Sequence, residues 1–139
     1  MIVVTTNEVP GYRVDAVLGE VMGLTVRAAN LGANVVASFR SLGGGEVKEY
    51  TRLVHESRKE VMHRMVEEAR RRGANAVVGM RFDTGEIAAS FSEVCAYGTA
   101  VVVSPIPAGQ PGATAQSAYL AAAGTAPQDT PETPAPPTT

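Results

Sequence analysis

The sequence predicts an α+β fold, with long antiparallel strands packed on one long helix plus one short helix. Three observations predict it. Residues 12–28 alternate between two kinds of side chain with a period of two, which is typical of a strand. Residues 46–72 repeat apolar side chains at helical spacing. Residues 91–103 are largely apolar on both faces of a further strand, which indicates cover on two sides.

The N-terminal part is predicted to be a short strand followed by an unusually long one. Residues 2–6 are β-branched, and Pro10 with Gly11 supplies a turn. The alternation then runs over residues 12–28, much longer than the usual strand of about five or six residues. Gly19 and Gly23 indicate bends, bulges or close backbone contacts. Either this strand pairs with a neighbouring subunit, or it is a single bent strand broken at one of these glycines.

Two helices are expected. A short one covers residues 34–42, where Asn34 can cap it and apolar residues recur at near-helical spacing. The long one carries acidic residues near its start, arginines near its end, and Gly73 where a left-handed cap is expected. The strand after it, residues 75–82, is expected to end at the turn residues 83–85.

Composition divides the chain after residue 104. Eight of the nine prolines lie at or after Pro105, and the only charged residues beyond that point are Asp129 and Glu132. Such a segment buries too little apolar surface to offset the loss of chain entropy. We therefore expect an α+β domain over residues 1–104 and a disordered Pro/Ala/Thr-rich tail over residues 105–139, with one helical turn around residues 117–123.

Charge and cysteine content exclude several classes of function. The tail holds two of the 14 acidic residues and none of the 12 basic ones, so the rest of the chain is balanced. No nucleic acid partner is expected from this balance. No signal peptide or spanning helix is expected either, so no membrane partner is predicted and the cytoplasm is the default location. The single cysteine, Cys95, excludes an intrachain disulfide and fits a reducing compartment.

Candidate metal ligands are few: His55, His63 and Cys95. The two histidines are eight residues apart on the predicted helix, which rotates them by about 80° and prevents them from sharing an ion unaided. They are therefore expected to be solvated helix residues, and Cys95 a small apolar core residue. The alternative is that oligomeric symmetry gathers one ligand from each subunit around an axis. The sequence identifies no cofactor, and a metal ion is the class that stays open.

Arg81 and Asp83, with Glu86 and Glu93 beyond them, form the densest polar group on the predicted strands. An ion pair or a turn cap explains this group, and a ligand pocket is the alternative. Further candidates to line a shared ligand pocket are Thr5, Thr6 and Tyr50. No nucleophile, base or cofactor motif accompanies these residues, so no catalytic residue is predicted.

The chain resembles the YbjQ-like family, small bacterial and archaeal proteins that carry a heavy-metal-binding label. The resemblance rests on Thr5-Thr6 with Val9-Pro10-Gly11-Tyr12, Gly44-Gly45-Glu46 with Lys48-Glu49-Tyr50-Thr51, Arg64-Met65 with Glu67-Glu68-Ala69, residues 73–84 and residues 96–103. It implies an α+β fold assembled as a homo-oligomer, a pentameric ring. The family has no well-established ligand set, and Cys95 stands where its members usually carry an aliphatic residue.

Three functions are therefore weighed. The first is a non-enzymatic homo-oligomeric binding or scaffold protein, supported by more apolar strand surface than one helix can cover, which holds a small ligand or ion at its subunit interfaces. The second is a heavy-metal-binding protein that uses His55, His63, Cys95 or carboxylates of a ring. The third is an enzyme with an interface pocket near Arg81 and Asp83.

Overall fold

A computed structural model describes residues 1–28, 48–88 and 91–124 of the chain. Its elements are, in order, β1 (Ile2–Val3), β2 (Tyr12–Ala28), α2 (Lys48–Arg71), β3 (Ala76–Ala88), β4 (Phe91–Pro105) and α3 (Ala115–Ala122). The predicted α+β class is confirmed, and the described residues form one mixed four-stranded sheet, one long helix, α2, and one short helix, α3. The short helix expected over residues 34–42 lies outside the described residues.

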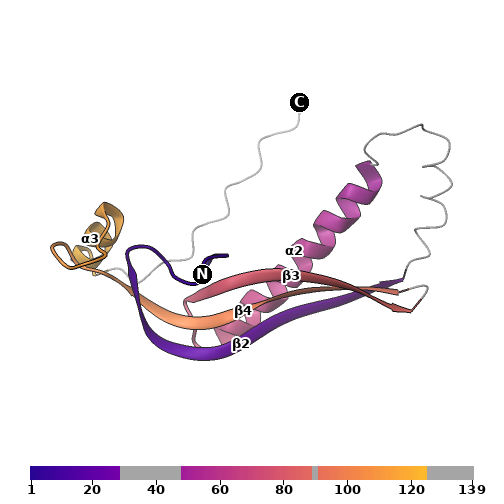
Figure 1. The fold of residues 1–139 in the computed structure, drawn as a ribbon, viewed down its shortest axis with the longest axis horizontal. Coiled ribbons are helices and arrows are strands. Elements are labelled where there is room, and N and C mark those ends of the chain that lie inside the picture. The colour runs from indigo at the N-terminus through magenta and orange to yellow at the C-terminus, as the bar shows by residue number, and fades with distance from the viewer. Residues whose placement is uncertain (29–47, 89–90, 125–139) are drawn as a thin grey trace.

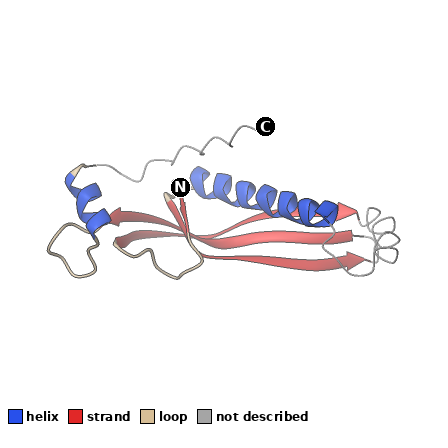
Figure 2. Ribbon diagram, turned by 90° about the horizontal axis from the view of Figure 1, so that it is seen from above, coloured by secondary structure: helices blue, strands red, loops and turns tan. Residues whose placement is uncertain are grey.

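The strand order in the sheet is β1-β3-β4-β2, so β2 is an outermost strand. It pairs antiparallel with β4, which pairs antiparallel with β3, whereas β1 runs parallel to β3. α2 lies along one face of this sheet, and α3 lies beyond one end of it (Figures 1 and 2).

The prediction of a turn at residues 83–85 is wrong, because β3 continues to Ala88. Asp83, Thr84 and Gly85 pair in register with Cys95, Val94 and Glu93 of β4. Ladder hydrogen bonds and cross-strand contacts here outweigh the low strand propensity of aspartate and glycine. This extension places Asp83 within a strand, paired with Cys95 of β4, instead of in a turn.

The two glycines of β2 have different roles. Gly19 has a φ of +95° and follows a shift in the pairing register after Val17, so it marks a β-bulge. Gly23 stays in register with Ala96, and a Cβ on it would overlap the backbone of α2 at Val61 and Met65. β2 is therefore one continuous strand with a bulge at Gly19 and a close helix contact at Gly23.

α2 packs on the sheet through residues spaced four apart. Its buried side chains are Ser57, Val61, Met65 and Ala69. The apolar ones among them pack in a core with Val21, Ala74, Val77, Met80, Ala96 and Ala100. Burial of this apolar surface is the main favourable contribution to folding.

The C-terminus of α2 ends as the sequence predicts. Gly73 has a φ of +83°, and its N–H donates to the Arg70 carbonyl at 2.9 Å. The N–H of Ala74 donates to the Ala69 carbonyl at 3.0 Å, which completes a Schellman cap. Only glycine adopts this backbone conformation without strain.

The opposite face of the sheet is covered only in part. At the end near β1, a second core joins Val9, Ala76, Val78, Val101 and Val103, with Ile2, Val4 and Tyr12 packed against it. Farther along β2, Met22, Leu24 and Val26 are 46%, 41% and 48% exposed. We call the part of this face formed by residues 20, 22, 24 and 26 of β2, 83 and 85 of β3, and 93, 95 and 97 of β4 the open face.

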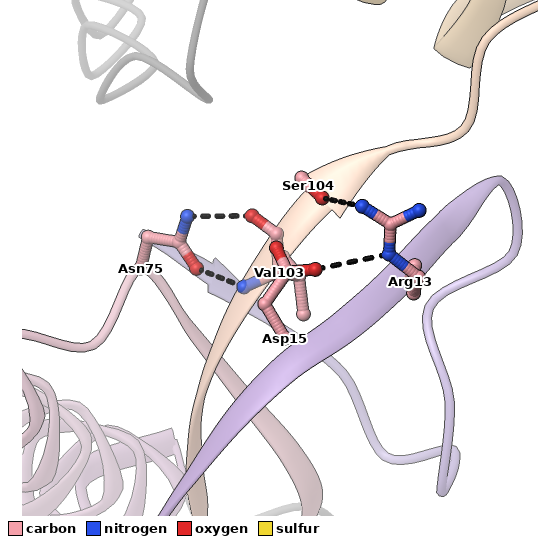
Figure 3. A network of polar contacts seen from close by, with 5 residues as sticks. All are labelled: Arg13, Asp15, Asn75, Val103 and Ser104. Carbon is pink, nitrogen blue, oxygen red and sulfur yellow. Dashed lines mark hydrogen bonds and ion pairs between the residues drawn. The ribbon is translucent and has the colours of Figure 1, made fainter.

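A polar network joins the start of β3 to the start of β2 and the end of β4 (Figure 3). The side chain of Asn75 donates to the carbonyl of Val103 and accepts from its N–H, both at 2.8 Å, as a neighbouring strand would. Beside it, Arg13 donates to Asp15 at 3.0 Å and to Ser104 at 3.4 Å. A hydrogen bond with Ser104, together with Arg13, lowers the pKa of Asp15 below its usual value.

Residues 106–124 contain α3, which overlaps the helical turn expected around residues 117–123, and they are more structured than the disordered tail expected over residues 105–139. Thr114 and Ser117 form a capping box at the start of α3, and Ser117 is fully buried. Gly11 has a φ of +82°, and a Cβ on it would stand 2.6 Å from Thr114 Oγ1, so only glycine leaves room for this helix. The N–H of Ile106 also donates to the Gly11 carbonyl at 2.9 Å. α3 packs where Gly11 has no Cβ, and a pattern of apolar residues does not reveal such a contact.

Candidate functional site

A solvent-open hollow of about 320 Å³ lies on the open face, and three strands supply its walls. β2 contributes Glu20 and Met22; β3 contributes Asp83, Thr84 and Gly85; β4 contributes Glu93, Cys95 and Tyr97. The hollow thus combines three carboxylates, one thiol, one thioether and one phenol.

Strand register explains why these side chains meet. Cys95 of β4 lies opposite Asp83 on one neighbouring strand and opposite Leu24 on the other. Glu93 lies two residues along the same strand and so on the same face. Glu20 belongs to the same alternate set of β2 as Leu24, which brings a third carboxylate to this face.

The carboxylates change the chemistry of the thiol. Burial raises the pKa of Cys95 above its usual value, and the charges of Glu93, Asp83 and Glu20 raise it further. The thiol therefore keeps its proton at neutral pH. The same negative potential favours a cation in the hollow, and a cation bound to the sulfur would displace this proton.

Among the predicted ligand-pocket residues whose side chains the structure describes, Asp83 and Glu93 line the hollow. Arg81 instead donates from Nη1 to the carbonyls of Thr5 and Met80, at 2.7 and 2.8 Å. Thr6 donates from its hydroxyl to the Glu8 carbonyl at 2.6 Å, and its own carbonyl accepts from Gly79 N at 2.7 Å. The structure therefore brings Thr5 and Arg81 together as a tie between the N-terminal segment and β3.

The remaining predicted ligand-pocket residue is Tyr50. It lies in the first turn of α2, and its side chain is outside the described part of the structure.

The predicted metal ligands lie on two sides of the sheet. His55 and His63 are exposed on α2, whereas Cys95 belongs to the face opposite that helix. Within residues 1–28, 48–88 and 91–124, no three His, Cys, Asp or Glu residues are placed to hold a metal ion. A metal centre built on Cys95 would need ligands from a second chain or a rearrangement of the nearby carboxylates.

Sequence reasoning missed Glu20, Met22 and Tyr97 as site residues. Their place in the hollow depends on the register of β2 with β4, where Met22 lies opposite Tyr97 and Glu20 opposite Thr99. The signal in the sequence was the period-two pattern of β2, which puts Glu20 among apolar neighbours.

No described helix has the length and apolarity needed to cross a membrane.

Comparisons with known proteins identify relatives over the same residues. The family model YbjQ_1, described as "Putative heavy-metal-binding", matches residues 1–104. A UPF0145 protein of Mycobacteroides abscessus is 58% identical over 106 residues, which cover 76% of this chain and 99% of the relative. A UPF0145 protein of Streptomyces coelicolor is 57% identical over 104 residues, which cover 75% and 98%.

The chain is also similar to a crystal structure of a DUF74-family protein with unknown function from Pediococcus pentosaceus. That similarity has a TM-score of 0.46 at 16% identity and covers 74% of this chain and 97% of the other. The family model and the curated relatives span nearly all of the residues that form the sheet and α2. On this basis, the chain belongs to the YbjQ_1 family.

Proposed function

We propose that this chain is a non-enzymatic, homo-oligomeric protein that self-associates through its open face and holds a cation in the hollow on that face. The observation that carries this proposal is the combination of exposed Met22, Leu24 and Val26 with three carboxylates around Cys95. Neighbouring exposed apolar side chains are typical of interaction sites. Carboxylates clustered around a thiol favour a positively charged ligand.

A second copy is the occupant that fits the open face best. Small domains bury a low fraction of their surface, so they gain more from association than large ones do. Most soluble oligomers are symmetric assemblies of one chain. A pentameric ring is the assembly suggested by the resemblance to this family.

A thiophilic metal ion is the cation that the hollow favours. Thiolate and thioether ligands prefer soft ions, and Cys95 and Met22 supply one sulfur of each kind. A neighbouring subunit would complete a ligand set that one chain leaves incomplete. The description of the family agrees with such a role. The proposal assumes a cytoplasmic setting, in which the thiol stays reduced.

The assembly is tested by measuring molar mass in solution by light scattering. Val26→Glu puts a charge on the open face outside the hollow, and we expect it to dissociate the oligomer. Val54→Glu is the matched control on α2, where Val54 is 37% exposed, and it should keep the wild-type mass. A wild-type chain that is monomeric at micromolar concentration would remove the self-association proposal.

Metal binding is tested on protein purified without an affinity tag. Cadmium or zinc is added, and the bound metal is counted after gel filtration. Cys95→Ser and Asp83→Asn are expected to lose most of the bound metal, whereas His63→Ala, on the other side of the sheet, is expected to retain it. Equal metal content in all four proteins would contradict a site in the hollow.

A further inference from the structure

The side chains of Arg64 and Glu68 of α2, and of Arg72 directly after it, reach the outer edge of β2. Arg64 Nη1 donates to the Leu24 carbonyl at 2.7 Å, and Arg72 Nη1 donates to the Glu20 carbonyl at 2.6 Å. Between them, the N–H of Met22 donates to Glu68 Oε2 at 3.1 Å. Because β2 is an outermost strand, these backbone groups point away from β4, and no other strand of the described residues pairs with them on that side.

The three contacts recur at nearly the same distance along α2 as along β2. Residues 64, 68 and 72 are four apart, which is about 6.0 Å along a helix. Residues 24, 22 and 20 are two apart, which is about 6.6 Å along a strand, and alternate residues turn their backbone groups to the same side. Three consecutive outward-facing positions of β2 therefore each meet one side chain from α2 or from Arg72 directly after it. We call these three contacts the edge clamp.

Other contacts hold the clamp in place. Arg64 donates to Glu60 at 2.8 Å, and Arg72 forms an ion pair with Glu68. Gly23, in the middle of the clamped stretch, lets the backbone of α2 approach β2 closely enough for these side chains to reach its edge. The hydrogen bond from Met22 also lowers the pKa of Glu68, which keeps its carboxylate charged.

We propose that the outer edge of β2 at residues 20–24 is a latent pairing site for β2 of a second copy of this chain, which the edge clamp keeps closed. An open strand edge presents unpaired N–H and C=O groups and so is a template for strand addition. Two identical β2 edges can pair antiparallel about a two-fold axis. Charged side chains over an edge are one of the ways in which proteins prevent this pairing. The proposal concerns the edge of β2 and is independent of association through the open face.

Hydrogen exchange at single residues tests whether the clamp closes the edge. Glu68→Ala is expected to speed exchange of the Met22 amide at least tenfold, with little change at Val21 and Gly23, whose backbone groups face β4. Glu68→Gln keeps an acceptor for the Met22 N–H and should retain most of the protection. An unchanged Met22 rate in Glu68→Ala would overturn the proposal, because the edge would not depend on this side chain.

Molar mass tests whether an opened edge pairs. The triple variant Arg64→Ala, Glu68→Ala, Arg72→Ala should leave α2 intact, because alanine has a high helix propensity. It is expected to form species larger than wild type whose mass grows with concentration, also in a Val26→Glu background that removes the open-face contact. The control variant Arg52→Ala, Glu56→Ala removes an exposed ion pair of the same spacing from α2 and should keep the wild-type mass.

A folded triple variant with wild-type mass at all concentrations would overturn the latent pairing site. If the triple variant does not fold, the single variant Glu68→Ala is measured in its place. A mass above wild type and faster Met22 exchange would then support the latent pairing site. Wild-type mass or an unchanged Met22 rate would overturn it.

Discussion

Gly23 of β2 lies directly against the backbone of α2 at Val61. A Cβ on Gly23 would overlap the Val61 carbonyl oxygen and stand 2.7 Å from the backbone nitrogen of Met65. Both obstacles are main-chain atoms of a helix, so a change of rotamer cannot relieve them. This contact sets the distance between α2 and the sheet, and with it the reach of Arg64 and Glu68 to the edge of β2.

Gly23→Ala is therefore expected to destabilise the protein by about 3 kcal/mol or more, since overpacking against backbone has to displace the helix. Urea unfolding followed by circular dichroism measures the change. Gly85→Ala is the control, because the nearest atom to its Cβ would be the end of the Glu93 side chain at 3.7 Å. Equal stability of the two variants would mean that α2 does not lie this close to β2.

Asn75→Ala is expected to cost about 2 kcal/mol. The substitution leaves both the N–H and the carbonyl of Val103 without the partners that Asn75 supplies at 2.8 Å, and unpaired polar groups in a partly buried position are costly. Chemical denaturation gives the free energy of unfolding. The exposed Asn7→Ala is the matched control and should change stability by less than about 0.5 kcal/mol. A small effect of both changes would show that Val103 does not rely on Asn75.

Glu68 makes stability depend on pH in a definite direction. Its pKa in the folded protein is lowered, first by the hydrogen bond from the Met22 N–H and then by Arg72, so the folded state favours the charged carboxylate. The resulting stabilisation is fully present above the usual glutamate pKa of about 4.3 and is lost as the pH falls through the lowered value. The stability difference between wild type and Glu68→Gln should shrink from pH 7 to pH 3. A difference that is constant over this range would contradict the contact.

Cys95 is expected to react slowly with thiol reagents at neutral pH, because burial and the charges of Glu93, Asp83 and Glu20 raise its pKa. The double variant Glu93→Gln, Asp83→Asn removes the first two of these charges. It should shift the pH profile of iodoacetamide alkylation to lower pH. Glu86→Gln removes a carboxylate that does not line the hollow and serves as control. The same alkylation profile in all three proteins would show that these carboxylates do not act on the thiol.

The sequence predicted the positions of the helices and strands better than it predicted which of their faces are buried. The extent of β2, most of α2 and the cap at Gly73 follow from periodicity and glycine chemistry, which act locally. Alternation along β2 separates two faces but does not reveal which one the helix covers. The structure puts Val21 and Gly23 under α2 and leaves Met22 and Leu24 exposed, because a close helix contact needs the glycine on the inner side.

The candidate site was predictable only in part for the same reason. Asp83 and Cys95 were recognised as residues of interest, but Glu20 joins them through pairings between residues that are about seventy positions apart. Glu68 and Arg72 are four residues apart, a spacing that favours an ion pair along a helix, and the structure contains this pair. Their contacts with β2 depend on where α2 lies on the sheet, which single-sequence periodicity does not define.

The molar mass of the purified chain in solution tests the proposed self-association through the open face most directly. At micromolar concentration, wild type and Val54→Glu should both have the mass of one defined oligomer, and Val26→Glu should have the mass of a single chain. A monomeric wild type, or a Val26→Glu variant that keeps the full oligomer mass, would contradict it.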